Sequence, residues 1–187
     1  PSYLVGNNLA SHCKWGNYWE GLYLMKSNDC NLWTNPIKII DRDWGLRNNC
    51  CCFDSQPSLT YDSNTGIYYL YCRNNPDLQV RKLQVFRTNN IDNWSNNAVE
   101  INIDIDIYIY TAHIFKYKDK FVAVVRYYFD TAKYTYDNHQ IGILISNDGI
   151  NFTVFKECFI DNYIYEIHGD ITQGHNIINN ELKIYFL

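Results

Sequence analysis

Short runs of β-branched and aromatic residues alternate with turn-forming residues along most of this chain. Such runs predict strands joined by tight turns. The clearest hairpins are predicted at 58–73, 113–126 and 175–187, each with a polar turn between two apolar runs. No long window shows the apolar stripe of an amphipathic helix. The pattern therefore predicts an all-β protein.

A second turn motif occurs three times in the sequence, beginning at Met25, Phe86 and Leu144. Each copy has an apolar residue, a hydroxyl two places on, Asp or Asn two further, and an aromatic residue four further. The Asp or Asn is expected to cap the turn by accepting backbone amides. The copies stand 61 and 58 residues apart, and a regular period of that size is typical of arrays and propellers.

Each repeat is predicted to hold two hairpins, which gives four antiparallel strands. Runs that are apolar on both faces, such as 121–125, are typical of a sheet stacked between neighbours. The prediction is a single β-propeller domain over 1–187, with four-stranded blades in the approximate units 1–53, 54–107, 108–165 and a partial 166–187. A sandwich is the alternative fold.

About three blades would leave open edges with unpaired backbone groups. We therefore expect a partial propeller. It is either a segment of a five- or six-bladed chain or a ring that further blades from a second chain complete. The absence of an initial Met and of a hydrophobic leader leads to the same expectation of a processed chain or a piece of a longer one.

Charge and composition narrow the possible partners. A net charge of −4 and no basic stripe argue against a nucleic-acid partner. No apolar run is long enough to predict a membrane span. The seven cysteines do not have zinc-site spacing, and neither a metal nor a cofactor is expected. Unpaired thiols favour a reducing compartment, whereas a glycan-directed function would favour an extracellular or surface location.

Three segments carry a family resemblance: 57–61, 66–71 and 88–94. Together they are similar to the blade signature of carbohydrate-active β-propellers. These include the sialidase-like proteins with Asp boxes and the five-bladed arabinanase and fructosidase type glycosidases. The resemblance implies a propeller that binds or hydrolyses glycans. The turn spacing departs from the strict sialidase Asp box, which puts its aromatic residue one place later.

In a propeller, the first strand of each blade lines the central channel, so polar residues on those strands are the candidates for chemistry. The predicted catalytic carboxylates are Asp54, Glu166 and Asp170, because glycoside hydrolysis uses two carboxyl groups on either side of the scissile bond. Any of them could instead cap a turn. The predicted substrate-binding residues are Arg73, Arg126, Tyr108, Tyr110, His113 and His175.

Arg73 and Arg126 occupy the same repeat position, where two guanidinium groups could hold a carboxylated sugar or could pair with neighbouring blades. The histidines match no standard metal-ligand set. Two functions remain from the sequence. One is a glycoside hydrolase-like propeller of sialidase or arabinanase type. The other is a non-catalytic propeller that serves as a binding, adhesion or assembly module.

Overall fold

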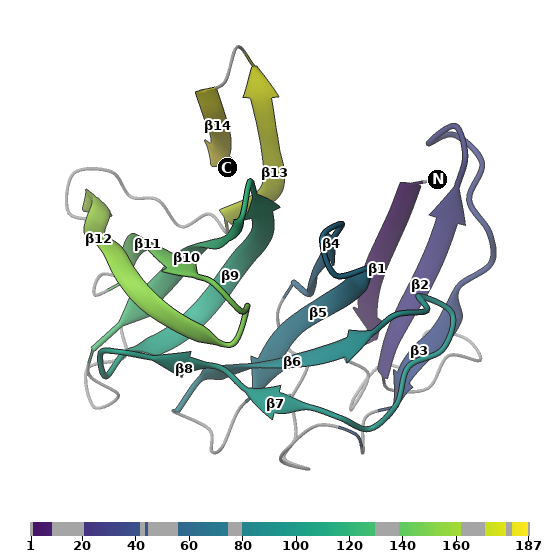
Figure 1. The fold of residues 1–187 in the computed structure, drawn as a ribbon, viewed down its shortest axis with the longest axis horizontal. Coiled ribbons are helices and arrows are strands. Elements are labelled where there is room, and N and C mark those ends of the chain that lie inside the picture. The colour runs from purple at the N-terminus through teal and green to yellow at the C-terminus, as the bar shows by residue number, and fades with distance from the viewer. Residues whose placement is uncertain are drawn as a thin grey trace. The chain divides into compact units, whose positions relative to one another are not determined.

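The computed structural model describes residues 2–8, 21–41, 44, 56–74, 80–129, 139–161, 171–178 and 181–186. Strands β1 to β14 account for the regular structure, and this part of the chain contains no α-helix (Figure 1). The prediction of an all-β protein is confirmed. The chain divides into two compact units, Pro1–Ile101 and Asn102–Leu187.

The first unit contains two antiparallel sheets. One has the order β1-β2-β3, formed by β1 (Ser2–Asn8), β2 (Gly21–Ser27) and β3 (Ile37–Asp41). The other has the order β4-β5-β6-β7, formed by β4 (Ser58–Asp62), β5 (Ile67–Asn74), β6 (Lys82–Thr88) and β7 (Val99–Glu100). Neighbouring strands therefore follow one another in sequence, as in a meander.

One hydrophobic cluster joins the two sheets of this unit. Its buried members on the first sheet include Leu22, Leu24 and Ile40, and those on the second sheet include Leu70 and Phe86. The opposite face of the second sheet is also covered, since Tyr69, Tyr71 and Val85 are buried as well. A sheet that is buried on both faces explains why its strands read as nearly continuous apolar runs.

The second unit contains a larger sheet and a hairpin. The sheet has the order β8-β12-β11-β10-β9. Its strands are β8 (Asn102–Ile103), β9 (Tyr108–Tyr117), β10 (Lys120–Tyr128), β11 (Gln140–Ser146) and β12 (Asn151–Asp161). The hairpin pairs β13 (Ile171–Ile178) with β14 (Glu181–Phe186). Strands β9 to β12 form the antiparallel meander expected of one repeat.

The run 98–103 does not form one continuous strand, because it is interrupted at Ile101 and divided into β7 and β8. The Ile101 backbone N–H donates to the Leu83 carbonyl at 3.0 Å, but the next N–H, of Asn102, donates to the Ile150 carbonyl at 3.0 Å. The residues after Ile101 therefore pair with β12, and this pairing is parallel. Ile101 itself is buried at this break.

The three repeated turns lie at corresponding connections, β2 to β3, β6 to β7 and β11 to β12. In the first and third copies the geometry is the same. Asp29 Oδ1 accepts the amides of Asn31 and Leu32, each at 2.9 Å. Asp148 Oδ1 accepts those of Ile150 and Asn151, each at 2.8 Å. The carboxylate thus closes a turn whose amides face inward.

The second copy carries Asn90 in place of the carboxylate, and its oxygen accepts a single amide, that of Asp92, at 3.1 Å. The aromatic residue of the turn also contributes a hydrogen bond. The Trp94 indole N–H donates to the Ile91 carbonyl at 2.7 Å, and the side chain is buried. In the first copy the exposed Trp33 makes the same bond to Cys30, at 3.2 Å.

Candidate functional site

A cluster of aromatic and basic side chains lies where β9 begins and β10 ends. Arg126 pairs with Thr111 across the two strands, but the next residue, Tyr127, pairs with Ile109. Tyr110 is therefore the extra residue of a β-bulge. A bulge bends its strand and redirects the side chain it carries, and bulges are frequent beside functional sites.

The redirected Tyr110 ring lies against two basic groups. The Arg126 guanidinium carbon is 5.1 Å from the centre of the Tyr110 ring, which is within cation–π range. The His139 ring is 4.9 Å from Tyr110 and 5.2 Å from Tyr128, and Tyr128 in turn stacks on Tyr108 at 5.3 Å. We call these five residues, Tyr108, Tyr110, Arg126, Tyr128 and His139, the Arg126 cluster.

Burial divides the Arg126 cluster into a base and a surface. Arg126, His139 and Tyr128 are at most 2% exposed, whereas Tyr108 and Tyr110 are half-buried. The two tyrosines can therefore present ring faces and hydroxyl groups to a ligand, with a buried cation behind one of them. Such an arrangement suits stacking on the apolar face of a sugar together with hydrogen bonds to its hydroxyl groups.

His113 lies further along the same strand and outside this cluster. It is buried at 6% exposure, faces Val124 across the ladder, and has the Phe115 ring 5.1 Å away. Its surroundings also include the buried cluster of Phe115, Val122, Val124 and Ile141. The structure therefore places His113 in the core rather than beside Tyr108 and Tyr110.

Arg73 lies at the end of β5, in the other unit. It is 4% exposed, and the Gln84 side-chain amide donates to its backbone carbonyl at 3.0 Å. Beside it, Asn74 donates to Glu100, which also pairs with Lys82 at 3.1 Å. The prediction that Arg73 and Arg126 act together stays a prediction, because each belongs to a different unit.

The three predicted catalytic carboxylates, Asp54, Glu166 and Asp170, lie outside the described residues. His175 lies in β13 and pairs with Ile184. Three described carboxylates have structural contacts instead: Asp29 and Asp148 cap turns, and Asp62 accepts the Asn64 amide at 3.1 Å. Within the described ranges no group of three or more His, Cys, Asp or Glu side chains could hold a metal ion.

Sequence reasoning found Tyr108, Tyr110 and Arg126 but missed Tyr128 and His139. Tyr128 lies two residues beyond the predicted end of the 113–126 hairpin, and in the structure β10 continues to it. His139 carried no such signal, because its contact with Tyr110 joins positions separated by a whole hairpin.

Among the residues that the structure describes, no helix is long and apolar enough to cross a membrane.

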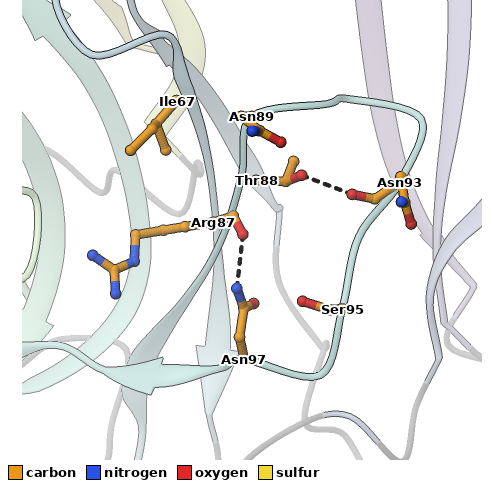
Figure 2. Close-up of a pocket in the computed structure, with 7 residues that line it drawn as sticks. All are labelled: Ile67, Arg87, Thr88, Asn89, Asn93, Ser95 and Asn97. Carbon is orange, nitrogen blue, oxygen red and sulfur yellow. Dashed lines mark hydrogen bonds between the residues drawn. The ribbon is translucent and has the colours of Figure 1, made fainter.

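An open pocket of about 490 Å³ lies beside the β6–β7 turn in the first unit. Figure 2 shows the residues that line it: Ile67, Arg87, Thr88, Asn89, Asn93, Ser95 and Asn97. Two hydrogen bonds hold its shape. The Thr88 hydroxyl donates to the Asn93 carbonyl at 2.7 Å, and the Asn97 side-chain amide donates to the Arg87 carbonyl at 2.8 Å.

Neither a family model nor a curated protein matches the chain. Solved structures of similar fold include two whose names state an activity. One is an N-acetylgalactosamine deacetylase from F. plautii in complex with blood group B trisaccharide, at 13% identity and a TM-score of 0.51 over 72% of this chain. The other is a glycoside hydrolase, at 13% identity and a TM-score of 0.48 over 75% of this chain.

This chain spans 43% of the length of the deacetylase and 45% of that of the glycoside hydrolase. At such low identity the similarity to the deacetylase shows a shared fold and nothing about activity. Both structures are carbohydrate-active enzymes by name. What this chain shares with the deacetylase is the fold, and the deacetylase is a carbohydrate-active enzyme by name.

Proposed function

We propose that this chain forms part of a carbohydrate-active β-propeller of glycoside hydrolase-like type, and that it binds glycans at the Arg126 cluster. The observation that carries the proposal is the pair of half-buried rings Tyr108 and Tyr110, with the bulge at Tyr110 and a buried guanidinium behind that ring. A sugar ring can stack on such a surface while its hydroxyl groups bond to the phenol oxygens. The carbohydrate-active deacetylase of similar fold supports the same class of ligand.

The propeller architecture is part of this proposal. It is supported by three turns at corresponding strand connections and by a meander of β4 to β7 that is matched by β9 to β12. In that architecture β4 and β9 are first strands, so Tyr108 and Tyr110 lie at one end of a channel-lining strand. The proposed activity is that of a glycoside hydrolase of either sialidase or arabinanase type.

Catalysis in the proposal uses Asp54 with Glu166 or Asp170 as the two carboxyl groups. One carboxylic acid would protonate the leaving oxygen of the glycosidic bond. The other, ionised, would attack the anomeric carbon or activate a water molecule. His175 would contribute to binding from the first strand of the following unit, together with Arg73.

The first experiment separates binding from turnover. In the natural protein that contains this chain, Tyr110→Ala should weaken binding of the preferred glycan by about 5- to 150-fold, because a stacking surface worth about 1–3 kcal/mol is removed. Tyr61→Ala is a matched control, since Tyr61 is a 48% exposed tyrosine on the other unit. Equal effects of the two substitutions would contradict a site at Tyr110.

The second experiment tests catalysis with a panel of aryl-glycosides. Asp54→Asn and Asp170→Asn should each lower turnover by at least about 10²-fold, because a general acid or nucleophile is lost. If no glycoside in the panel is hydrolysed although glycans bind at Tyr110, the protein is the non-catalytic binding module.

A further inference from the structure

The pocket beside the β6–β7 turn combines one cation with five uncharged polar side chains. Arg87 supplies the charge, and the others are Thr88, Asn89, Asn93, Ser95 and Asn97, with Ile67 as the apolar exception. In Figure 2, Arg87 extends away from the turn on the side of Ile67, with Asn89 above it and Asn97 below it in the view. A lining of this kind is matched to a ligand with one negative charge and several hydroxyl groups.

The charge of Arg87 is not neutralised within the described part of the chain. The ion pairs found there join Lys26, Lys38, Lys82 and Lys120 to carboxylates, and Arg87 takes part in none of them. The side chain is half-buried, so its charge is only partly screened by water. An anionic group at the pocket would therefore gain a charge-assisted hydrogen bond.

The internal repeat is consistent with the lack of a carboxylate partner for Arg87 among the described residues. Arg87 precedes the turn hydroxyl of the second copy, as Lys26 does in the first copy. Lys26 forms an ion pair with Asp92, a residue of the following turn. The position equivalent to Asp92 in the third copy is Ile150, which is apolar. The second copy therefore has a cation, Arg87, at the position of Lys26, but the third copy has no carboxylate at the position of Asp92.

The polar side chains around Arg87 differ in what they already bond. Thr88 and Asn97 are used to hold the turn. The side chains of Asn89, Asn93 and Ser95 are exposed, and within the described residues none of them makes a hydrogen bond. They can donate to and accept from sugar hydroxyl groups. At about 490 Å³ the pocket is too large for a simple anion and has room for a monosaccharide.

We propose that this pocket binds a carboxylated sugar, with the carboxylate on the Arg87 guanidinium and the ring hydroxyl groups on uncharged polar side chains of the same lining. The site belongs to the first unit, whereas the Arg126 cluster belongs to the second. The inference stands on the pocket alone and does not require the proposed function at the Arg126 cluster.

The test is calorimetric titration of the full chain with methyl glucuronide, methyl glucoside and acetate as probes. Methyl glucuronide should bind at least about tenfold more tightly than either other probe, because only it satisfies both the cation and the amides. Arg87→Gln should weaken glucuronide binding about tenfold and leave glucoside binding unchanged. Arg87→Lys should fall between the two, since it keeps the charge but loses the planar fork.

Lys38→Gln is the matched control, because it removes one positive charge from the same unit at a residue that pairs with Asp41. It should leave glucuronide binding unchanged. Equal binding of glucuronide and glucoside, equal binding of glucuronide and acetate, or insensitivity to Arg87→Gln in a folded variant would overturn the proposal. So would the absence of glucuronide binding at millimolar concentration.

Tyr110→Ala keeps the two sites apart in this test. Glucuronide binding at the Arg87 pocket should survive that substitution, whereas binding at the Arg126 cluster should not. Loss of glucuronide binding in Tyr110→Ala but not in Arg87→Gln would place the sugar at the Arg126 cluster and overturn the assignment to Arg87.

Discussion

The carboxylates of the repeated turns show how a single residue sets local electrostatics. Hydrogen bonds from the backbone amides of Leu32 and Asn31 lower the pKa of the exposed Asp29 carboxyl group. At Asp148, burial acts to raise the pKa, but the amides of Asn151 and Ile150 and the side chains of Asn151 and Ser146 outweigh it and lower the pKa from 3.8 to about 2. Both side chains therefore stay ionised to a lower pH than an ordinary aspartate.

In the Asp148→Asn variant, the free energy of unfolding should fall less between neutral and acid pH than it does in the wild-type chain. The folded-state pKa of about 2 lies below the ordinary value of 3.8, so the ionised carboxylate stabilises the fold above pH 3.8 and this contribution is lost as pH falls towards 2. After allowance for solvent screening at this exposed turn, the contribution is about 1 kcal/mol. Urea denaturation at neutral pH and at pH values on either side of 3.8 measures it.

Asp106→Asn is the control for that experiment, because Asp106 is an exposed aspartate with no hydrogen bond or ion pair in the described residues. Its pH profile should follow that of the wild-type chain. If Asp148→Asn loses the same free energy of unfolding between neutral and acid pH as the wild-type chain does, the turn carboxylate is not the group responsible.

At the scale of the strand, β2 begins at a glycine that the sheet requires. Gly21 has φ +150°, and a Cβ added there would overlap with the Ile40 carbonyl oxygen on β3. The pairing of β2 with β3 is irregular at this point, since its register shifts between Leu22 and Tyr23. The close approach of the two backbones leaves no space for a side chain.

Gly21→Ala should lower the free energy of unfolding by about 1–3 kcal/mol, because the new methyl group meets rigid backbone rather than a flexible side chain. Thermal unfolding followed by circular dichroism checks this. Gly66→Ala is the comparison, since Gly66 has φ +71° but nothing within 4 Å of an added Cβ, and should cost about 1 kcal/mol. A larger effect at Gly66 than at Gly21 would contradict the steric explanation.

At the scale of the whole molecule, each unit has its own core, and the first unit joins two sheets through one. Phe86 on β6 is fully buried in that cluster with residues of β2 and β3. An ion pair between Lys26 and Asp92 connects the same two sheets at their surface. The apolar contacts carry most of the stability, because an exposed ion pair contributes at most about 1 kcal/mol.

Phe86→Ala should therefore lower the free energy of unfolding by about 3–5 kcal/mol through lost burial and a cavity. Guanidinium denaturation followed by tryptophan fluorescence measures it, since Trp94 belongs to the same cluster. Phe155→Ala, at a 68% exposed phenylalanine, should change stability by about 0.5 kcal/mol or less. Similar losses in both variants would show that the two sheets of the first unit do not share a core.

The sequence by itself determined the strands, the hairpins and the chemistry of the repeated turns, because these depend on residues a few positions apart. The prediction of Asp29, Asn90 and Asp148 as turn caps needed only the order of hydroxyl, carboxylate or amide, and aromatic residue. The break at Ile101 could not be predicted, since two ladders compete there for adjacent amides of one apolar run.

Only the tertiary structure decided which residues meet at the candidate sites. The bulge at Tyr110, the approach of His139 and the placement of His113 in the core depend on how strands align across a sheet, and a shift of one residue reverses the face of every side chain. That Arg87 has no ion pair among the described residues, whereas Lys26 pairs with Asp92, likewise depends on which carboxylates the fold brings near each cation. Local pattern determines the elements, whereas long-range register determines what they place together.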